Sequence, residues 1–315
     1  MSVLSASYMH DETAAFAHVE AMLWADGPVC PSCGSVGNVY VLDGVRSKAS
    51  KKNPEGVVRH GLKKCRDCGN QFTVRVGTIF ESSHVKLHLW LQAIHLMCSS
   101  KKGISSNQLH RTLGVTLKTA WFMSHRIREA MRTDGSVDFG AGGGVVEVDE
   151  TFIGREPGMV KKAAYHHKMK IVTLVDRDTG RSKSIVVDDL KIKTLAPILL
   201  ENIAKEARIF TDEATHYLRL ARPFADHQTV NHKAGEYVRG EIHTNTAEGY
   251  FSIFKRGMKG VYQHCAKKHL HRYAAEFEFR YNNRVANGVG DLGRANIALN
   301  GIVGKRVLYR DSLGA

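Results

Sequence analysis

Three carboxylates lie where the local sequence pattern does not require one. Asp149 lies in the middle of VVEVDETFI, an alternating segment typical of a strand, and Asp212 follows the apolar residues of ARIFTDEA. Glu248 lies near the start of an otherwise apolar helical run in HTNTAEGYFSIFKRG. An acid in a central strand is costly unless a positive charge neutralises it. Two acids on adjacent strands and a third on a helix are able to hold two divalent cations, and oxygen ligands favour Mg²⁺ or Mn²⁺.

The start of the third segment also has a structural interpretation. Asn245 and Glu248 have the spacing of the N-cap and N3 residues of a capping box, a common way to begin a helix. Lys255 lies two helical turns after Glu248 and therefore on the same face. An ammonium group beside a metal-binding carboxylate suits a DNA phosphate. On these residues alone, the capping and metal-ligand interpretations both stay open.

Four of the six cysteines form two tight pairs, CPSCG and CRDCG. Two C-x-x-C knuckles supply the four thiolates that a tetrahedral zinc site prefers. The 31 residues between the pairs exceed the commonest zinc spacing, so we expect the stretch 44–64 to be an insertion at the tip of a ribbon. That stretch carries seven Lys and Arg residues and one Glu. We therefore predict one structural Zn²⁺ bound by Cys30, Cys33, Cys65 and Cys68.

The composition favours a polyanionic partner. The chain has 315 residues, with 45 Lys and Arg against 31 Asp and Glu, a formal net charge of +14. Such an excess is typical of nucleic-acid binding. No run of about 18 apolar residues is present, so no membrane span is predicted. The N-terminus lacks the basic start and apolar core of a signal peptide, so a cytoplasmic protein is expected.

Hydrophobic periodicity predicts the elements that position these residues. The N-terminal part has helical patterns at 11–24 and 85–97 and a strand-like pattern at 71–80, in which Phe72, Val74 and Val76 alternate. The glycine-rich FGAGGG at 139–144 is typical of a linker. Beyond it, the pattern predicts strands at 145–153, 169–175, 182–189 and 207–212, a helix at 194–206, an irregular region at 222–243 and a helix at 269–284.

Residues 104–131 predict a helix, a tight turn at Gly114 and a second helix capped by Thr116. If the second helix enters a DNA groove, its exposed side carries residue types that contact phosphates and base edges: Lys118, Ser124, His125 and Arg128. Its inner side then carries Ala120, Met123 and Ile127. A helical hairpin of this kind is also a common packing unit, so this segment alone does not establish DNA binding.

The three acidic segments resemble, in the same order, the active-site blocks of DDE transposases of bacterial insertion sequences. The group that they resemble has an N-terminal zinc ribbon and an ISXO2-like catalytic domain. FTVRVGTIFESS, the later W-x-x-AI segment and EFEFRYNNR also resemble that family. The resemblance implies an RNase H-like α/β domain, a mixed sheet with flanking helices, preceded by a zinc ribbon and a helix-turn-helix. The expected parts are a zinc ribbon with its leading helix (1–83), a helical DNA-binding region (84–138), a catalytic domain (144–285) and a C-terminal tail (286–315).

The resemblance also implies roles for the acids. Asp149 would bridge two Mg²⁺ or Mn²⁺ ions, Asp212 would bind one of them and Glu248 the other. Lys255 would contact the transposon end, and Arg256 would extend the positive edge along the DNA backbone. The third position of this family is not always Glu, since Asn and His variants occur, so Asn245 is an alternative third ligand, and His243 also lies close to that position.

The implied function is that of an insertion-sequence transposase. Such a protein binds terminal inverted repeats, hydrolyses the end of the element and transfers its 3′-OH to target DNA. Synapsis of two ends implies a homo-oligomer, and the expected location is the bacterial cytoplasm, at the nucleoid. Two alternatives remain at this point: a structure-selective nuclease on the same fold, and a DNA-binding regulator without catalysis.

Overall fold

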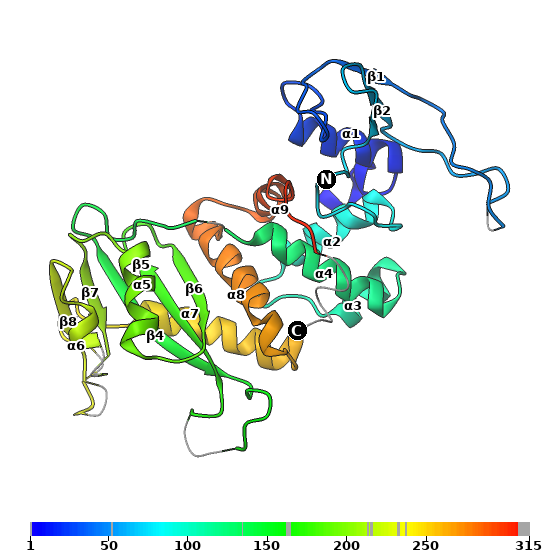
Figure 1. Ribbon diagram of the computed structural model, residues 1–315. Coiled ribbons are helices and arrows are strands. Elements are labelled where there is room, and N and C mark those ends of the chain that lie inside the picture. The colour runs from blue at the N-terminus through cyan, green and yellow to red at the C-terminus, as the bar shows by residue number, and fades with distance from the viewer. Residues whose placement is uncertain are drawn as a thin grey trace. The chain divides into compact units, whose positions relative to one another are not determined.

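The chain folds as two units built from different kinds of secondary structure (Figure 1). The computed structural model describes residues 2–51, 53–133, 135–161, 165–212, 214, 217–231, 234–236 and 238–307. Unit 1 comprises residues 1–100, 104–131 and 291–315, and unit 2 comprises residues 101–103 and 132–290. Each unit is described by itself.

Unit 2 is built on a five-stranded mixed sheet with the order β6-β5-β4-β7-β8. Strand β4 pairs antiparallel with β5, and β5 pairs antiparallel with β6, whereas β4–β7 and β7–β8 are parallel pairs. This mixed topology with flanking helices is that of an RNase H-like fold, as expected. The strands are β4 (Val145–Ile153), β5 (Met169–Asp176), β6 (Ser182–Val187), β7 (Arg208–Thr211) and β8 (Asp226–Thr229).

Strand β8 lies in the region that the sequence predicted to be irregular. Its four residues, DHQT, are polar and half-buried, so it has no apolar alternation that would indicate a strand. The prediction of a linker at 139–144 is also wrong. Phe139 is buried in the core of unit 2, and the Gly140 N–H donates a 3.0 Å hydrogen bond to Asp176 Oδ2, so this segment is packed against the sheet.

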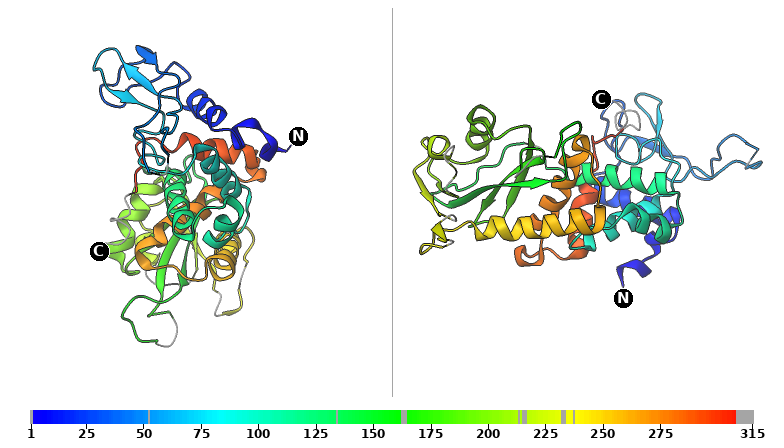
Figure 2. Two further views of the ribbon diagram at one scale, coloured as in Figure 1. Left: turned by 90° about the vertical axis from the view of Figure 1, so that its right-hand side faces the viewer. Right: turned by 90° about the horizontal axis from the view of Figure 1, so that it is seen from below.

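The two faces of the sheet are covered by different helices. On one face Val146 and Val148 pack in a core with residues of α5 and α6. On the other face Ile153 and Ile171 pack against α7 and α8, and Figure 2 (right) shows α7 running along this face. The helices are α5 (Ile192–Asn202), α6 (Tyr217–Leu220), α7 (Asn245–Gly257), with the π-helical turn Met258–Tyr262 after it, α8 (Lys267–Asn282) and the 3₁₀ turn Val285–Asn287.

Helix α8 covers the edge of the sheet at β6. The Asn282 side chain accepts a hydrogen bond from Ser182 N (2.7 Å) and donates one to Ser182 O (2.8 Å). Glu278 Oε2 accepts from Ser184 N at 2.8 Å. These side chains pair backbone groups that an edge strand would otherwise expose to another chain.

Unit 1 combines a zinc-ribbon-like sheet with helices. Its antiparallel sheet has the order β1-β2-β3, and the basic insertion connects β1 to β2, which confirms its expected place at the tip of the ribbon. The strand predicted at 71–80 ends early, because the chain turns after Phe72 with a hydrogen bond from Val76 N to Thr73 O. The elements are the 3₁₀ turns Val3–Ser5 and Ser7–Met9, α1 (Glu12–Leu23), β1 (Val39–Val41), β2 (Lys63–Cys65), β3 (Gln71–Phe72), α2 (Leu87–Ser99), α3 (Ser106–Leu113), α4 (Leu117–Met131) and α9 (Asp291–Asn300).

The helical hairpin follows its prediction. Gly114 ends α3 in the left-handed conformation with φ 64°, and Thr116 Oγ1 accepts a hydrogen bond from Thr119 N at the start of α4. The predicted apolar face of α2 is buried: Leu87, Trp90, Leu91, Ile94 and Met97. Within the described residues, no helix is long and apolar enough to cross a bilayer.

The segment expected as a C-terminal tail contains a packed helix. Ala295, Ala298 and Leu299 of α9 recur at helical spacing and are buried. Arg294 Nε donates a 2.9 Å hydrogen bond to the carbonyl oxygen of Cys98 at the end of α2. The apolar face of α9 thus belongs to the core of unit 1, while positions 308–315 lie outside the described residues.

Candidate functional site

Two of the three predicted acids lie at the same level of neighbouring strands. The parallel pairing of β4 and β7 places Glu147 opposite Phe210, and Asp149 and Asp212 each lie two residues beyond that pair. The alternation of β4 directs Val146 and Val148 into the core with α5, so Asp149 lies on the opposite face, against which α7 packs. Helix α7 carries Glu248 in its first turn.

The charges of these acids act on one another. Burial raises the pKa of Asp149 well above its usual range, and the charge of Glu150 raises it further, while a hydrogen bond from the Glu150 backbone N–H lowers it. The charges of Asp212 and Glu248 also raise the pKa of Asp149. The structure therefore brings the three predicted acids into one electrostatic cluster. A cluster of this kind favours a bound cation, because the negative charges otherwise repel.

The side chain of Glu150 points away from Asp149, as predicted, toward the core that contains α6, but its charge still acts on the cluster. Burial raises the pKa of Glu150 to about 7, a hydrogen bond from Tyr217 lowers it, and the charge of Asp212 raises it. Tyr217 is fully buried on α6 and donates to Glu150 Oε2. No local sequence pattern indicated Tyr217, whose neighbours at 215 and 216 lie outside the described residues.

The predicted capping box at the start of α7 is not formed. The N-cap residue is Thr244, whose side chain makes no capping hydrogen bond, and Asn245 is exposed at the first helical position. The capping oxygen comes instead from strand β4. Glu147 Oε2 accepts from Ala247 N at 2.9 Å, and Glu147 Oε1 accepts from Thr246 Oγ1 at 2.8 Å. Asn245 therefore does not fix the helix by its side chain.

A buried ion pair holds Glu147 in place. Arg177 Nε donates to Glu147 Oε1 at 2.6 Å, and the Glu147 side chain is 0% exposed. Arg177 Nη2 also contacts His243 Nδ1 at 2.7 Å, so this histidine is engaged in the loop before α7. Removing one partner of such a buried pair is expected to cost about 3–5 kcal/mol. The alternation of β4 placed Glu147 on the face of Asp149, but the pairing with Arg177 had no sequence signal.

Lys255 lies near the acid cluster, on the same helix as Glu248. Burial lowers its pKa, the charge of Asp149 raises it, those of Lys259 and Lys168 lower it, and that of Glu248 raises it. The ammonium group lies 5.9 Å from the centre of the Phe251 ring. Arg256 is exposed one residue further, and its Nε donates to Ser252 O. Two cationic side chains thus follow Glu248 along α7.

The expectation of an exposed DNA-reading side on α4 is wrong for three of its four residues. Ser124, His125 and Arg128 are buried, whereas Lys118 is exposed near the start of the helix. Arg128 Nη1 donates to Ser124 Oγ, which itself donates to Trp121 O. The His125 ring packs on the Trp121 ring at 4.2 Å. These polar groups bond and pack along the helix, so polarity alone did not indicate its exposed face.

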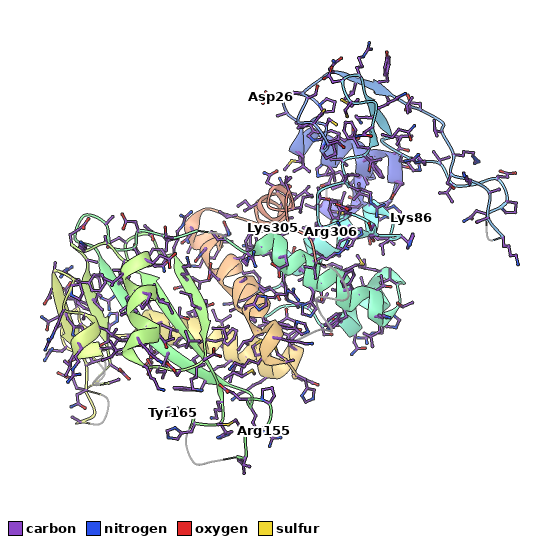
Figure 3. The ribbon with its side chains drawn as sticks, viewed as in Figure 1. Asp26, Lys86, Arg155, Tyr165, Lys305 and Arg306 are labelled. Carbon is purple, nitrogen blue, oxygen red and sulfur yellow. The ribbon has the colours of Figure 1, made fainter. Side chains whose placement is uncertain are left out.

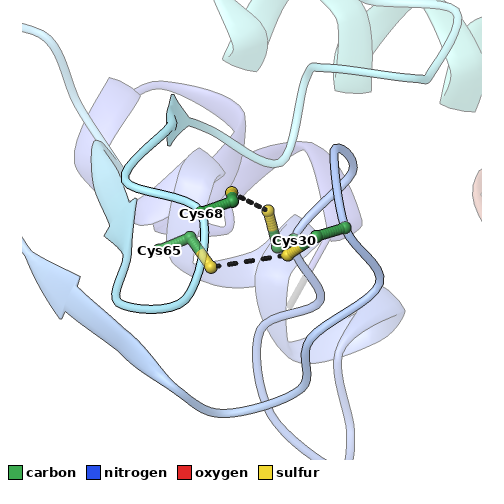
Figure 4. A group of neighbouring side chains, drawn as sticks. Cys30, Cys65 and Cys68 are labelled. Carbon is green, nitrogen blue, oxygen red and sulfur yellow. Dashed lines mark hydrogen bonds between the residues drawn. The ribbon is translucent and has the colours of Figure 1, made fainter.

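The four cysteines of the two knuckles converge in unit 1 (Figure 4). The Sγ atoms of Cys30 and Cys68 are 3.7 Å apart, and those of Cys33 and Cys65 are 3.6 Å apart. Zinc–sulfur bonds of about 2.3 Å in a tetrahedron give sulfur separations of roughly 3.8 Å. The geometry therefore fits one structural Zn²⁺. Within the described part of the chain, no other group of three His, Cys, Asp or Glu residues is gathered to within 4.8 Å.

The acids of unit 2 are more widely spaced than the thiols. Their oxygens do not form a group within 4.8 Å among the residues described, yet Asp149 is subject to the charges of both other acids. Two cations about 3.5–4 Å apart require ligands spread over a larger site than one zinc ion does. The donor set of carboxylate oxygens fits Mg²⁺ or Mn²⁺ rather than a thiolate-preferring metal.

Unit 1 also has an open groove of about 670 Å³ beside the ribbon insertion. Three cationic residues that line it, Arg46, Arg59 and Lys86, are exposed, and Figure 3 labels Lys86. His60 and His84 add two further basic groups to the lining. The lining also contains Arg75 and two acids, Glu12 and Glu81, so the basic residues outnumber the acids and the groove favours an anionic ligand.

Two family models match the chain. Residues 10–71 match the transposase zinc-ribbon domain, and residues 142–282 match the ISXO2-like transposase domain. With the four-cysteine cluster and the mixed sheet, these matches identify two domains of transposase type. The first is a zinc ribbon, and the second is an ISXO2-like domain with an RNase H-like fold.

Two individual proteins are also similar. An uncharacterized protein in transposable element ISH50 of Halobacterium salinarum is 25% identical over 279 residues, which cover 82% of this chain and 86% of that protein. The second is a chain of the simian T-cell lymphotropic virus intasome, solved by cryo-electron microscopy in complex with PP2A regulatory subunit B56 gamma. It has 12% identity and a TM-score of 0.29, over 54% of this chain and 63% of that one, less than two thirds of its length. At that score the second similarity carries no argument.

Proposed function

We propose that this protein is an insertion-sequence transposase that cleaves the ends of its element and joins them to target DNA. The observation that carries the proposal is the clustering of Asp149, Asp212 and Glu248, in which the charges of the other two acids raise the pKa of Asp149. The match of residues 142–282 to a transposase domain supports the same reaction class.

The three acids are the residues that would hold two Mg²⁺ or Mn²⁺ ions, with Asp149 between them, Asp212 on one and Glu248 on the other. When bound, such ions activate a water or a 3′-hydroxyl group and stabilise the leaving oxygen of a phosphodiester. Glu147 holds the helix of Glu248, and Glu150 is held by Tyr217. Lys255 would contact a phosphate beside the scissile bond, and Arg256 the next phosphate along the strand.

Both proposed reactions are displacements at phosphorus. Hydrolysis at the end of the element releases a 3′-OH, and that hydroxyl then attacks a phosphodiester of the target. Because attacking and leaving oxygens have the same chemistry in both steps, one set of acids serves them in turn. Glu248 is the third ligand in this proposal because its charge acts on Asp149.

Recognition of the terminal inverted repeats is assigned to unit 1. The basic groove with Arg46, Arg59 and Lys86 supports a contact with the DNA backbone, as does the exposed Lys118 on α4. Ser124, His125 and Arg128 are left out of this surface because they are buried. We further propose that a homo-oligomer pairs two ends in the synaptic complex, and that the protein works on DNA in the bacterial cytoplasm.

A strand-transfer assay tests the function. The purified full-length chain is incubated with labelled DNA that carries an element end, a supercoiled target plasmid and Mg²⁺ or Mn²⁺. We expect labelled ends joined to the plasmid. Nicked ends that are never joined would instead identify a nuclease, and end binding without cleavage would identify a regulator; either result contradicts the proposal.

A further inference from the structure

Glu147 links the strand of Asp149 to the helix of Glu248. It lies two residues before Asp149 on β4, and its Oε2 accepts the N–H of Ala247, the residue directly before Glu248. The path from one proposed ligand to the other therefore crosses a single 2.9 Å hydrogen bond. Thr246 adds a second bond from the same helical turn to Glu147 Oε1.

The helix itself supplies little to hold this turn. The first four N–H groups of a helix have no partner within it, and a side chain at the N-cap usually accepts one of them. Thr244 does not do so here, and the Asn245 N–H contacts His243 Nδ1 at a long 3.3 Å. A carboxylate from β4 takes the capping place, and its negative charge suits the positive end of the helix dipole.

Arg177 extends the same link to the loop before α7. It donates to Glu147 Oε1 (2.6 Å), to Glu241 O (2.7 Å) and to His243 O (2.8 Å). One buried ion pair thus fixes both the approach to the helix and its first turn. Since both Glu147 oxygens already accept protein donors, the side chain is committed to holding α7.

We propose that Glu147 is a positioning residue of the active site, which sets the spacing between Asp149 and Glu248 by fixing the first turn of α7 to β4. The inference rests on the proposed function, because that function makes Glu248 a metal ligand. It concerns a residue that acts through Ala247 and not by touching the metal or the DNA.

Three variants of the full-length chain test this role. Glu147→Gln keeps the shape but places an NH₂ group among donors, and Thr246→Val removes one hydrogen bond only. Glu201→Gln, an exposed glutamate on α5, is the matched control for the loss of charge. We would measure three properties of each variant: amide hydrogen exchange in the first turn of α7, Mn²⁺ binding by electron paramagnetic resonance, and cleavage of element ends.

For Glu147→Gln we expect at least tenfold faster exchange of amides 246–248, with β5 amides unchanged. Mn²⁺ affinity should fall about 10- to 100-fold, the usual effect of losing a group that orients a ligand. The cleavage rate should fall together with the Mn²⁺ affinity, and it should recover in part as the Mn²⁺ concentration is raised. Thr246→Val is expected to fold even if Glu147→Gln does not. It should speed the exchange of amides 246–248 by about threefold to tenfold. The Glu201→Gln chain should match the wild type.

Each other outcome has a distinct meaning. Unchanged exchange of amides 246–248 in both Glu147→Gln and Thr246→Val overturns the inference. A loss of Mn²⁺ affinity without faster exchange also overturns it, because Glu147 would then itself be a metal ligand. Faster exchange together with full cleavage by Glu248→Ala would leave Glu147 holding α7 but refute the assignment of Glu248, so that the proposed function fails and not the structural link.

Discussion

The hydroxyl group of Tyr217 donates a 2.6 Å hydrogen bond to Glu150 Oε2, directly beside Asp149 in the chain. The tyrosine reaches the acid cluster from α6, whose residues belong to the core on the opposite face of the sheet. The acids of unit 2 are thus held from both faces, by Tyr217 on one and by α7 on the other.

The first prediction concerns this bond. Tyr217→Phe keeps the ring in the core but removes the hydroxyl donor to the partly buried Glu150 carboxylate, which costs about 1–3 kcal/mol. Urea unfolding of the full chain should show a loss of this size. Tyr165→Phe is the control, because Tyr165 is exposed on the β4–β5 connection (Figure 3). Equal stability of the two variants would contradict the prediction.

The acid cluster yields the second prediction. Each of three substitutions should lower the rate of end cleavage by about 10³-fold or more: Asp149→Ala, Asp212→Ala and Glu248→Ala. Such a decrease corresponds to the loss of several kcal/mol of metal-dependent stabilisation of the transition state. Binding to the inverted repeats, measured by gel shift, should remain. Asn245→Ala is the comparison, and it should cleave normally. Full cleavage by Glu248→Ala together with loss in Asn245→Ala would assign the third ligand to Asn245.

Lys255 gives the third prediction, on the salt dependence of DNA binding. If its ammonium group neutralises one phosphate, Lys255→Gln should reduce the slope of log K against log salt by about 1. Titrations of an end-containing duplex at several salt concentrations measure it. Lys205→Gln removes the same charge from an exposed position before β7 and should leave the slope unchanged. Identical slopes for the two variants would remove Lys255 from the DNA interface.

The fourth prediction is the effect of losing one thiolate. Cys65→Ser opens the four-cysteine cluster, so bound zinc, measured by plasma mass spectrometry, should fall from one per chain toward zero. Because zinc binding is coupled to folding, unfolding of unit 1 should move to lower temperature. Cys265→Ser, outside the cluster, should keep both its zinc and its stability. Retention of a full equivalent of zinc by Cys65→Ser would exclude the four-thiolate site.

Glu278 provides the fifth prediction, on pH. Burial raises its pKa from 4.5 to about 7, although the hydrogen bond from Ser184 N lowers it. At a pH between about 4.5 and 7, Glu278 keeps its proton in the folded chain but loses it in the unfolded chain. The free energy of unfolding therefore falls as pH rises through this range. The unfolding free energy of Glu278→Gln relative to that of the wild type should thus be about 2–3 kcal/mol higher at pH 8 than at pH 4.5. A difference in unfolding free energy that is the same at both pH values would contradict this.

The residues with a strong local pattern were predictable. The alternation of β4 determined which face Asp149 occupies, and the two knuckles identified all four cysteines of the cluster. In both, the information lies within a few neighbouring residues, since strand period and C-x-x-C spacing are local properties. The apolar face of α2 was found for the same reason.

The failures all depend on long-range contacts. The cap of α7 comes from Glu147, about 100 residues away, so the local Asn245–Glu248 spacing suggested a box that does not form. The side of α4 with Ser124 and Arg128 is buried because the helix packs among α2, α3 and α9, and the two buried side chains then bond each other. Strand β8 is defined by its pairing with β7, and its polar sequence carries no strand period.

The packing of α9 has a consequence for synthesis of the chain. Helix α9 and the residues after it supply the Arg294 bond to Cys98 and the bridge between Thr78 and Val303. Domains generally fold as they leave the ribosome, N-terminal first. Here the core of unit 1 stays open until residues 291–303 have been translated and have emerged. A nascent or prematurely terminated product therefore carries the complete ribbon but an unfinished helical core.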